Sequence, residues 1–414
     1  MNRWAVGGVA AMALALASCG SSPQTASSTA GGGSSPLSSS TPLSSSTPTP
    51  SPTATAQPTG PLAACLSNPP GGTPAPWGFA VTKGSEIEVL GTSGAVLNTA
   101  PLGNGYTLTE PVTVGVGQAG VYFYDESTGE LSVLGKSGAA QNLAQISPTG
   151  GWSAGNNAVS LAESPNGACW AFSLVSYGAS QASTSQIYVG GTGVTTTLVD
   201  TLTRANAING AVAGGYQLLR WDAAGLLLGT QPTGVGGGGG PFLDDDYALA
   251  TVVRLDLQTA TLSGPLCSSG QFADEAADGT VACLTGINTN TAIEVTKPGG
   301  STTTLDTGAA EVGQVAFVGG SSLLTYCTGG PAAAGSDFTE NLVTAQLGGS
   351  TPSTRTLISG STGSTLEGPW PWYKLAGSSP PSMVEIQYVD LVEVNLTTGQ
   401  ITTIAPADSV LGVL

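Results

Sequence analysis

The chain contains no histidine, and its nine lysine and arginine residues stand against 26 aspartates and glutamates, giving a formal charge of −17. Without an imidazole, the Ser/His/Asp and Cys/His nucleophile systems and histidine-ligated zinc sites are excluded. With so few cations the chain cannot neutralise phosphates, so we expect no nucleic-acid partner, and an anionic membrane surface would repel it. Hydrolysis by a carboxylate pair or by a lysine base stays open.

Charged residues of both signs are scarce. They make up 8% of the chain, whereas glycine contributes 61 of its 414 residues. Helices are built largely from residues such as Lys, Arg and Glu and are destabilised by glycine, so this composition points away from a helical protein and toward an all-β fold.

The first 18 residues have the features of a secretory signal peptide. A positive charge at Arg3 precedes an apolar run over residues 4–17, which is too short to cross a hydrocarbon layer of about 30 Å. The Leu-Ala-Ser-Cys sequence ending at Cys19 resembles the bacterial lipobox, in which the cysteine receives a diacylglyceryl group and becomes the new N-terminus. The resemblance implies lipidation of Cys19 and a stable membrane anchor. The alternative is ordinary cleavage after Ala17.

Residues 20–61 consist almost entirely of serine, threonine, proline, glycine and alanine, and carry no charge. Such a segment cannot bury enough apolar surface to offset its ordering entropy. We therefore predict a disordered stalk over residues 19–61, about 35 Å long on average as a flexible coil. Residues 62–414 then form the folded domain.

A hairpin signature recurs through residues 62–414. Alternating apolar residues lead into a turn containing glycine, which an Asp or Asn opens by bonding its own backbone, and a second apolar or threonine-rich run follows. The clearest copies span residues 121–134 and 391–404, and looser copies span 87–97, 187–198, 252–262, 293–305 and 342–357.

A second signature lies between these hairpins, at residues 164–172 and 276–284, where an Asn-Gly or Asp-Gly turn precedes an apolar strand. Together the two signatures resemble the repeats of bacterial β-propellers of the WD40-like and TolB-like kind. The resemblance implies an all-β propeller. Seven copies of the hairpin in residues 62–414 predict seven blades of about 50 residues each, and six or eight blades are alternatives. The rival architecture is a pair of β-sandwiches, which would lack this period.

The longest irregularity is a glycine run followed by Asp244, Asp245 and Asp246. Carboxylates are ligands that Ca²⁺ accepts, and inserted loops often carry function, so these residues are the first predicted ligand-binding site. Their spacing is not that of an EF-hand, and a solvated acidic loop without Ca²⁺ is the alternative. A phosphate-binding loop is excluded because no Gly-Lys-Ser/Thr follows.

Two further groups are candidate sites. Trp370 and Trp372 would stack on sugar rings or on a partner if they are exposed, and would otherwise fill the core. A pair of carboxylates could perform glycoside hydrolysis, although no spacing selects one pair. The carboxylates considered are Asp222, Asp244, Asp274, Glu275 and Glu367.

After Cys19, five cysteines remain, which fits an oxidising compartment. Many pairings are open to them. Cys267 and Cys283 are close in sequence, so a disulfide between them is predicted, with a loop-closure contribution of about 3 kcal/mol. A thiolate metal site is not expected, because the chain has no C-x₂-C pair.

These observations predict a lipoprotein anchored to the cell membrane on its extracytoplasmic side, whose propeller is a binding or protein-interaction module. The expected partner is an envelope protein or a glycan, and no catalytic residue or cofactor is assigned. One alternative is a carbohydrate-active propeller enzyme that uses a carboxylate pair. A third is a structural subunit of an envelope assembly.

Overall fold

The computed structural model describes most of the folded domain. The described residues are 62, 65, 75–101, 112–146, 157–177, 183–204, 215–230, 251–268, 271–285, 292–308, 311–318, 320–329, 338–348, 352–362, 373–374, 381–387 and 389–414. The predicted signal peptide, Cys19 and stalk lie outside this part of the chain. Residues 56–414 form one compact unit. Among the described residues, no helix is both long and apolar enough to cross a membrane.

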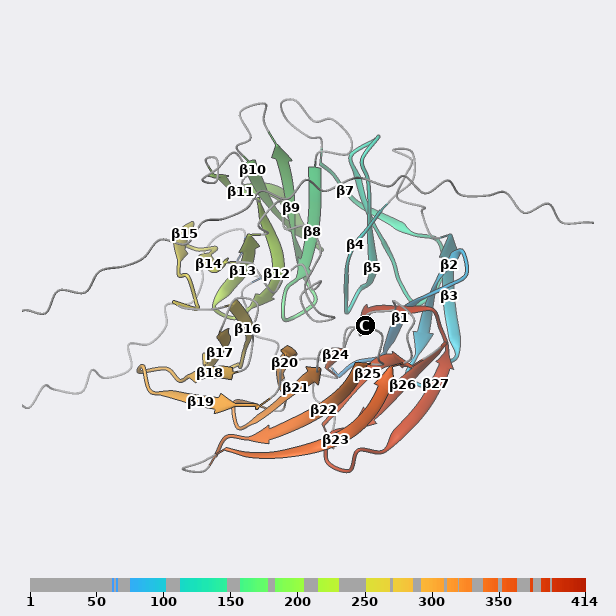
Figure 1. Cartoon of the computed structure of the whole chain (residues 1–414). Helices are drawn as coiled ribbons and strands as arrows, with labels where there is room; N and C mark the ends of the chain where they lie inside the picture. Colours follow the sequence, from blue (N-terminus) through green and yellow to red (C-terminus); the bar gives the residue numbers. More distant parts are fainter. Residues whose placement is uncertain are drawn as a thin grey trace, which may run out of the picture. The chain divides into compact units, whose positions relative to one another are not determined.

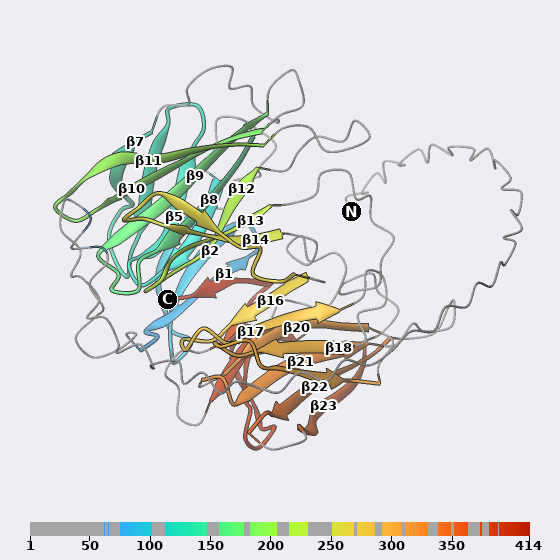
Figure 2. The same cartoon turned by 90° about the vertical axis from the view of Figure 1, so that its left-hand side faces the viewer.

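Seven antiparallel sheets of four strands each form a propeller (Figures 1 and 2). We number the blades in chain order and call the strands of each blade A to D from the innermost outward. Blade 1 contains β28 (Ser409–Val413), β1 (Gly78–Lys83), β2 (Glu86–Gly91) and β3 (Val96–Pro101), and blade 2 contains β4 (Val112–Gly117), β5 (Gly120–Asp125), β6 (Glu130–Leu134) and β7 (Gln141–Gln145). Blade 3 contains β8 (Asn157–Glu163), β9 (Cys169–Tyr177), β10 (Ser183–Gly191) and β11 (Val194–Arg204). Blade 4 contains β12 (Tyr216–Asp222), β13 (Gly225–Thr230), β14 (Thr251–Asp256) and β15 (Thr261–Ser263).

The remaining three blades repeat the same order of strands. Blade 5 contains β16 (Gln271–Glu275), β17 (Val281–Thr285), β18 (Ala292–Thr296) and β19 (Thr302–Asp306). Blade 6 contains β20 (Glu311–Phe317), β21 (Leu323–Gly329), β22 (Phe338–Gln346) and β23 (Ser353–Thr362). Blade 7 contains β24 (Tyr373–Lys374), β25 (Ser382–Gln387), β26 (Asp390–Asn395) and β27 (Ile401–Pro406). The prediction of a seven-bladed propeller is confirmed, and the alternative of two β-sandwiches is wrong.

Blade 1 is built from both ends of the folded domain. β28 pairs antiparallel with β1 and supplies the innermost strand, with Phe79 opposite Val413. The amide of Leu414 donates to the Gly78 carbonyl at 2.9 Å, and the amide of Trp77 donates to the Leu414 carbonyl at 2.7 Å. The ring is therefore closed by backbone hydrogen bonds, and the chain enters blade 1 at its second strand rather than its first.

Apolar clusters fill the junctions between neighbouring blades, because each sheet is covered on one face by the preceding blade and on the other by the following blade. Between blades 2 and 3, for example, the rings of Tyr124 and Phe172 lie 4.8 Å apart within a large buried cluster. Among the described residues, the smallest cluster lies between blades 4 and 5, where Leu227 and Val252 are the buried members. That junction therefore depends more on other interactions.

The two ends of the propeller differ in the length of their connections. At the AB end, where strand A meets B and C meets D, the connections are short, and residues 375–381 form the longest. At the BC end, where strand B meets C and strand D leads to the next blade, they are longer, and the longest spans residues 231–250. That segment holds the predicted Asp244–Asp246 site, and it joins β13 to β14 in blade 4.

The hairpin signature falls at two different places in the blade. The copy at 121–134 is the BC hairpin of blade 2, whereas the copy at 391–404 is the CD hairpin of blade 7, as are the five looser copies in their own blades. The turns themselves are alike: Asp125 accepts from the amides two and three residues on, and Asn395 does the same. Turn chemistry thus marks a hairpin without saying which hairpin of the blade it is.

Candidate functional site

Several predicted site residues lie outside the described residues: Asp244, Asp245, Asp246, Trp370, Trp372, Glu367 and Cys19. Their roles as ligand-binding, catalytic or lipidated residues therefore remain predictions. The other three carboxylates considered for catalysis are described. Asp222, Asp274 and Glu275 come together with Arg220 and Arg254 at the junction of blades 4 and 5, and we call these five residues the junction cluster.

Irregularities in two innermost strands position the cluster. The register of β12 against β13 shifts between Leu218 and Arg220, and the register of β16 against β17 shifts between Phe272 and Asp274. A bulge re-aims the side chain that follows it. Arg220 and Asp274 are the residues directly after these shifts, so both are turned toward the same blade junction.

Asp274 links three blades through one carboxylate. Its Oδ1 accepts from Nη1 of Arg220 in blade 4 at 2.9 Å, and its Oδ2 accepts from the backbone amide of Phe317 in blade 6 at 2.8 Å. Nη2 of Arg220 also donates to the Glu275 carbonyl at 3.1 Å. Asp274 is only 7% exposed, so these hydrogen bonds take the place of the water molecules that would solvate an exposed carboxylate.

Arg254 on β14 joins the two remaining carboxylates. Its guanidinium donates to Asp222 through Nη1 and to Glu275 through Nη2. Burial raises the pKa of Glu275, and the nearby Asp222 raises it further, while Arg254 and Arg220 lower it. The net shift is upward, which shows that desolvation outweighs the stabilisation of the Glu275 carboxylate by its arginine partners.

The arrangement has limited chemical use. A glycosidase pair needs one carboxyl free to protonate a leaving group and a second free to attack or to activate water. In the junction cluster each carboxylate is bound to an arginine, and Asp274 also accepts a backbone amide. Nor do the described residues contain a group of His, Cys, Asp or Glu side chains that could hold a metal ion. The cluster fits an interblade clamp better than a catalytic centre.

A second clamp lies between blades 2 and 3. Glu163, the last residue of β8, accepts hydrogen bonds from the amides of Gln118 and Ala119 in the AB turn of blade 2, the latter at 2.9 Å. The Tyr122 hydroxyl donates to the same carboxylate at 2.7 Å, and its pKa is raised by burial and by the charge of Glu163. This carboxylate is held by neutral donors, without an arginine.

Sequence reasoning missed both clamps, although a signal for them exists. Glu163 precedes Ser164-Pro-Asn-Gly and Glu275 precedes Ala276-Ala-Asp-Gly, so each carboxylate stands directly before the AB turn of its blade. In blade 3 the turn is held by Asn166, which accepts from the Ala168 amide at 3.0 Å. The two copies of the second signature therefore occupy equivalent places in blades 3 and 5.

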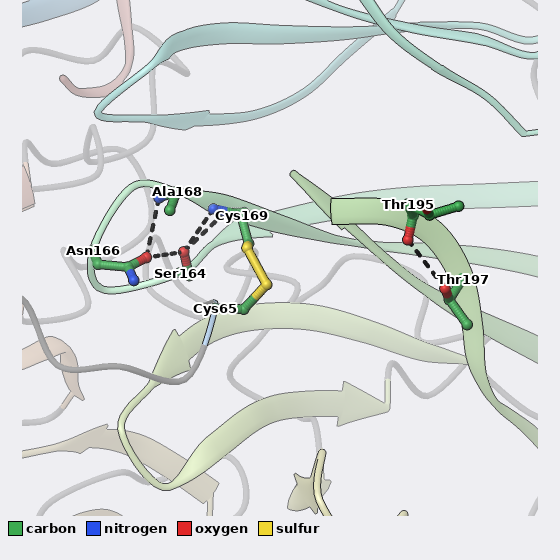
Figure 3. Close-up of a disulfide and its surroundings, with 7 residues drawn as sticks. All are labelled: Cys65, Ser164, Asn166, Ala168, Cys169, Thr195 and Thr197. Carbon is green, nitrogen blue, oxygen red and sulfur yellow. Dashed lines mark hydrogen bonds between the residues drawn. A yellow bond between two sulfur atoms is a disulfide. The ribbon is translucent and has the colours of Figure 1, made fainter. Parts of the chain in front are cut away.

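Both of these blades also carry a disulfide on strand B. Cys283 on β17 is bonded to Cys267, the pairing predicted from the sequence. Cys169 on β9 is bonded to Cys65, 104 residues earlier, a pairing the sequence left open (Figure 3). The fifth cysteine, Cys327, carries a buried thiol.

No protein-family model matches the chain, and no curated protein matches its sequence. Solved structures resemble it at low similarity. AztD from Citrobacter koseri has a TM-score of 0.38 and 10% identity, covering 81% of this chain and 96% of that chain. Virginiamycin B lyase from Staphylococcus aureus has a TM-score of 0.32 and 10% identity over the same shares. Prolyl oligopeptidase B from Galerina marginata has a TM-score of 0.36 and 10% identity, covering 77% of this chain and 44% of that chain. Values this low carry no inference about ligand or activity.

Proposed function

We propose that this protein is a lipid-anchored, extracytoplasmic β-propeller that binds a partner at the BC end and performs no catalysis. The observation that carries the proposal is the contrast between the two ends. The AB end is made of short turns tied together by clamps, whereas the BC end bears the long connections, including residues 231–250. Recognition surfaces are commonly built from long connections on a rigid scaffold.

The lipobox-like sequence ending at Cys19, the neutral stalk and the two disulfides support an extracytoplasmic position. The alternative, a carbohydrate-active enzyme, has less support. Of the carboxylates considered for that chemistry, the three that the structure describes are engaged in the junction cluster.

The anchor is tested by mass spectrometry of the N-terminal peptide from protein made in its own host, with Cys19→Ala as the matched control. We expect a lipidated Cys19 in the wild type, and release of the Cys19→Ala variant from the membrane fraction. An unmodified N-terminus located after Ala17 would contradict the anchor.

The binding role is tested by thermal-shift measurements on the mature chain against glycans, cell-wall fragments and divalent cations. A ligand that binds the native state raises the unfolding temperature by mass action. A rise abolished by substitution of residues in 231–250 would support the BC end as the binding surface. Turnover of a glycan that is lost in Asp222→Asn would instead favour the enzyme.

A further inference from the structure

The chain reaches the propeller at the AB end. β1 is strand B of its blade, so its first residue, Gly78, lies at that end. Just before it, the indole Nε1 of Trp77 donates to the Gln118 carbonyl, at 2.8 Å, in the AB turn of blade 2. The ammonium of Lys136, from the CD turn of the same blade, lies 4.2 Å from the centre of the Trp77 ring. Both contacts hold the entering chain against the AB end.

A second attachment lies two blades away. Cys65 is bonded to Cys169, the first residue of β9, directly after the AB turn of blade 3 (Figure 3). Leu62 packs against the buried cluster shared by blades 3 and 4. Two separate contacts, at Cys65 and at Trp77, therefore place the beginning of the folded domain at the AB end.

Charge is distributed unevenly between the ends. At the BC end the described side chains include seven carboxylates. The one cation among the described side chains at this end is Lys83, whose Nζ lies 3.9 Å from the Glu88 carboxylate. The seven carboxylates are Glu86, Asp125, Glu126, Glu130, Asp306, Asp390 and Asp408. At the AB end, carboxylates and cations nearly balance. The described cations there are Lys136, Arg220, Arg254, Lys297 and Arg355.

We propose that the protein stands on its membrane with the AB end toward the bilayer and the acidic BC end facing away. The inference rests on the lipid anchor of the proposed function. A tether fastened at the AB end keeps that end near the lipid, since residues 20–61 reach only about 35 Å on average as a flexible coil. Anionic headgroups repel the carboxylates of the BC end when these come within a Debye length of about 10 Å. The AB end, where carboxylates and cations nearly balance, is repelled less.

The test compares two positions at the opposite ends of one strand of blade 1. Ser85, in the turn between β1 and β2, and Ser93, in the turn between β2 and β3, are both exposed and lie at opposite ends of β2. Six residues separate the ends of that strand by about 20 Å. Ser85→Cys and Ser93→Cys are each labelled with a donor dye, and energy transfer is measured to acceptors on lipid headgroups. The parent chain, in which Cys327 is buried, serves as the labelling control.

The mature chain is attached to vesicles of phosphatidylcholine and phosphatidylglycerol in two ways. One sample carries the lipid added by the cell, and the other carries Cys19→Ala and an N-terminal histidine tag that binds a nickel-chelating lipid. If the cell-made protein does not attach to the vesicles, the proposed lipid anchor is wrong. The tagged sample still tests the orientation in that case.

We expect transfer from Ser93→Cys to exceed transfer from Ser85→Cys by about twofold, given the strand length that separates them. Equal transfer, or stronger transfer from Ser85→Cys, would overturn the proposed orientation. On vesicles of phosphatidylcholine alone the order should persist with a smaller difference, because the repulsion of the BC end is lost. A difference that does not shrink would remove the electrostatic part of the proposal.

Discussion

The junction between blades 2 and 3 and the junction between blades 4 and 5 solve one packing problem in different ways. Both place a glutamate at the end of an innermost strand, directly before an AB turn, and both have a disulfide on the next strand. At the first junction a large apolar cluster surrounds Tyr124 and Phe172, and Glu163 accepts from neutral donors. At the second the described apolar cluster is small, and Glu275 meets Arg254.

The comparison indicates which junctions depend on charge. Apolar burial is non-directional and independent of pH, so the junction of blades 2 and 3 needs its carboxylate chiefly to accept hydrogen bonds from the Tyr122 hydroxyl and from the AB turn of blade 2. Where apolar burial is thin, five charged side chains and a disulfide hold the blades. Buried ion pairs contribute little net stability, because desolvation offsets their attraction. We therefore infer that the junction of blades 4 and 5 is the weaker of the two.

The largest expected loss in the free energy of unfolding comes from removing a disulfide, and the two disulfides should differ in this loss. Replacing Cys65 and Cys169 together by alanine should lower the free energy of unfolding by about 4 to 5 kcal/mol, and replacing Cys267 and Cys283 by about 3 kcal/mol, because the longer closed loop restricts the unfolded chain more. Urea unfolding of the oxidised proteins, followed by tryptophan fluorescence, measures both. A larger loss from the Cys267 and Cys283 pair would show that native contacts at blades 4 and 5 outweigh loop length.

A smaller effect separates the two glutamates. Glu163→Gln should lower the free energy of unfolding by about 2 to 3 kcal/mol, because two amides and the Tyr122 hydroxyl lose a charged acceptor. Glu275→Gln should cost about 1 kcal/mol, since the charged form is already desolvated and Arg254 keeps Asp222. The exposed Glu86→Gln is the matched control in chemical denaturation. Equal losses for the first two variants would remove the distinction between the clamps.

The smallest effect is in the pH dependence. The folded-state pKa of Glu275 is raised above its ordinary value, so the folded protein binds a proton there before the unfolded chain does. This group therefore adds stability as the pH falls through its folded pKa toward the ordinary value of a glutamate, and removes it as the pH rises. Below that range Asp125 acts in the opposite sense: desolvation raises its pKa, but the hydrogen bonds from Ser127 and Thr128 together outweigh it, and the net pKa is lowered.

Melting temperatures of the wild type and Glu275→Gln between pH 7 and pH 4 measure this contribution. The variant should lose the stabilisation that the wild type gains on mild acidification. Because only 8% of the residues are charged, we also expect the domain to tolerate acid, and the same titration tests this. A fall in the melting temperature of tens of degrees between pH 7 and pH 4 would contradict that expectation.

Local signals in the sequence were sufficient for much of the fold. Alternating apolar runs and Asx-Gly turns predicted hairpins with the right period, because the turns at Asp125 and Asn395 are closed by bonds within a few residues. They could not tell a BC hairpin from a CD hairpin, since that difference lies in which other strands pair with the hairpin. The Cys267 to Cys283 bridge was predictable from nearness in sequence, whereas Cys65 to Cys169 joins segments that only the folded ring brings together.

The sequence by itself determined a β-forming composition without histidine, a lipobox-like sequence ending at Cys19, an uncharged segment over residues 20–61 and a repeated hairpin, since these depend on composition and short-range order. Only the tertiary structure decided that β28 closes blade 1, that Asp222, Asp274 and Glu275 share two arginines, and that the chain enters at the AB end. Each of these requires strands distant in sequence to become neighbours, and packing around the ring, rather than local propensity, supplies that proximity.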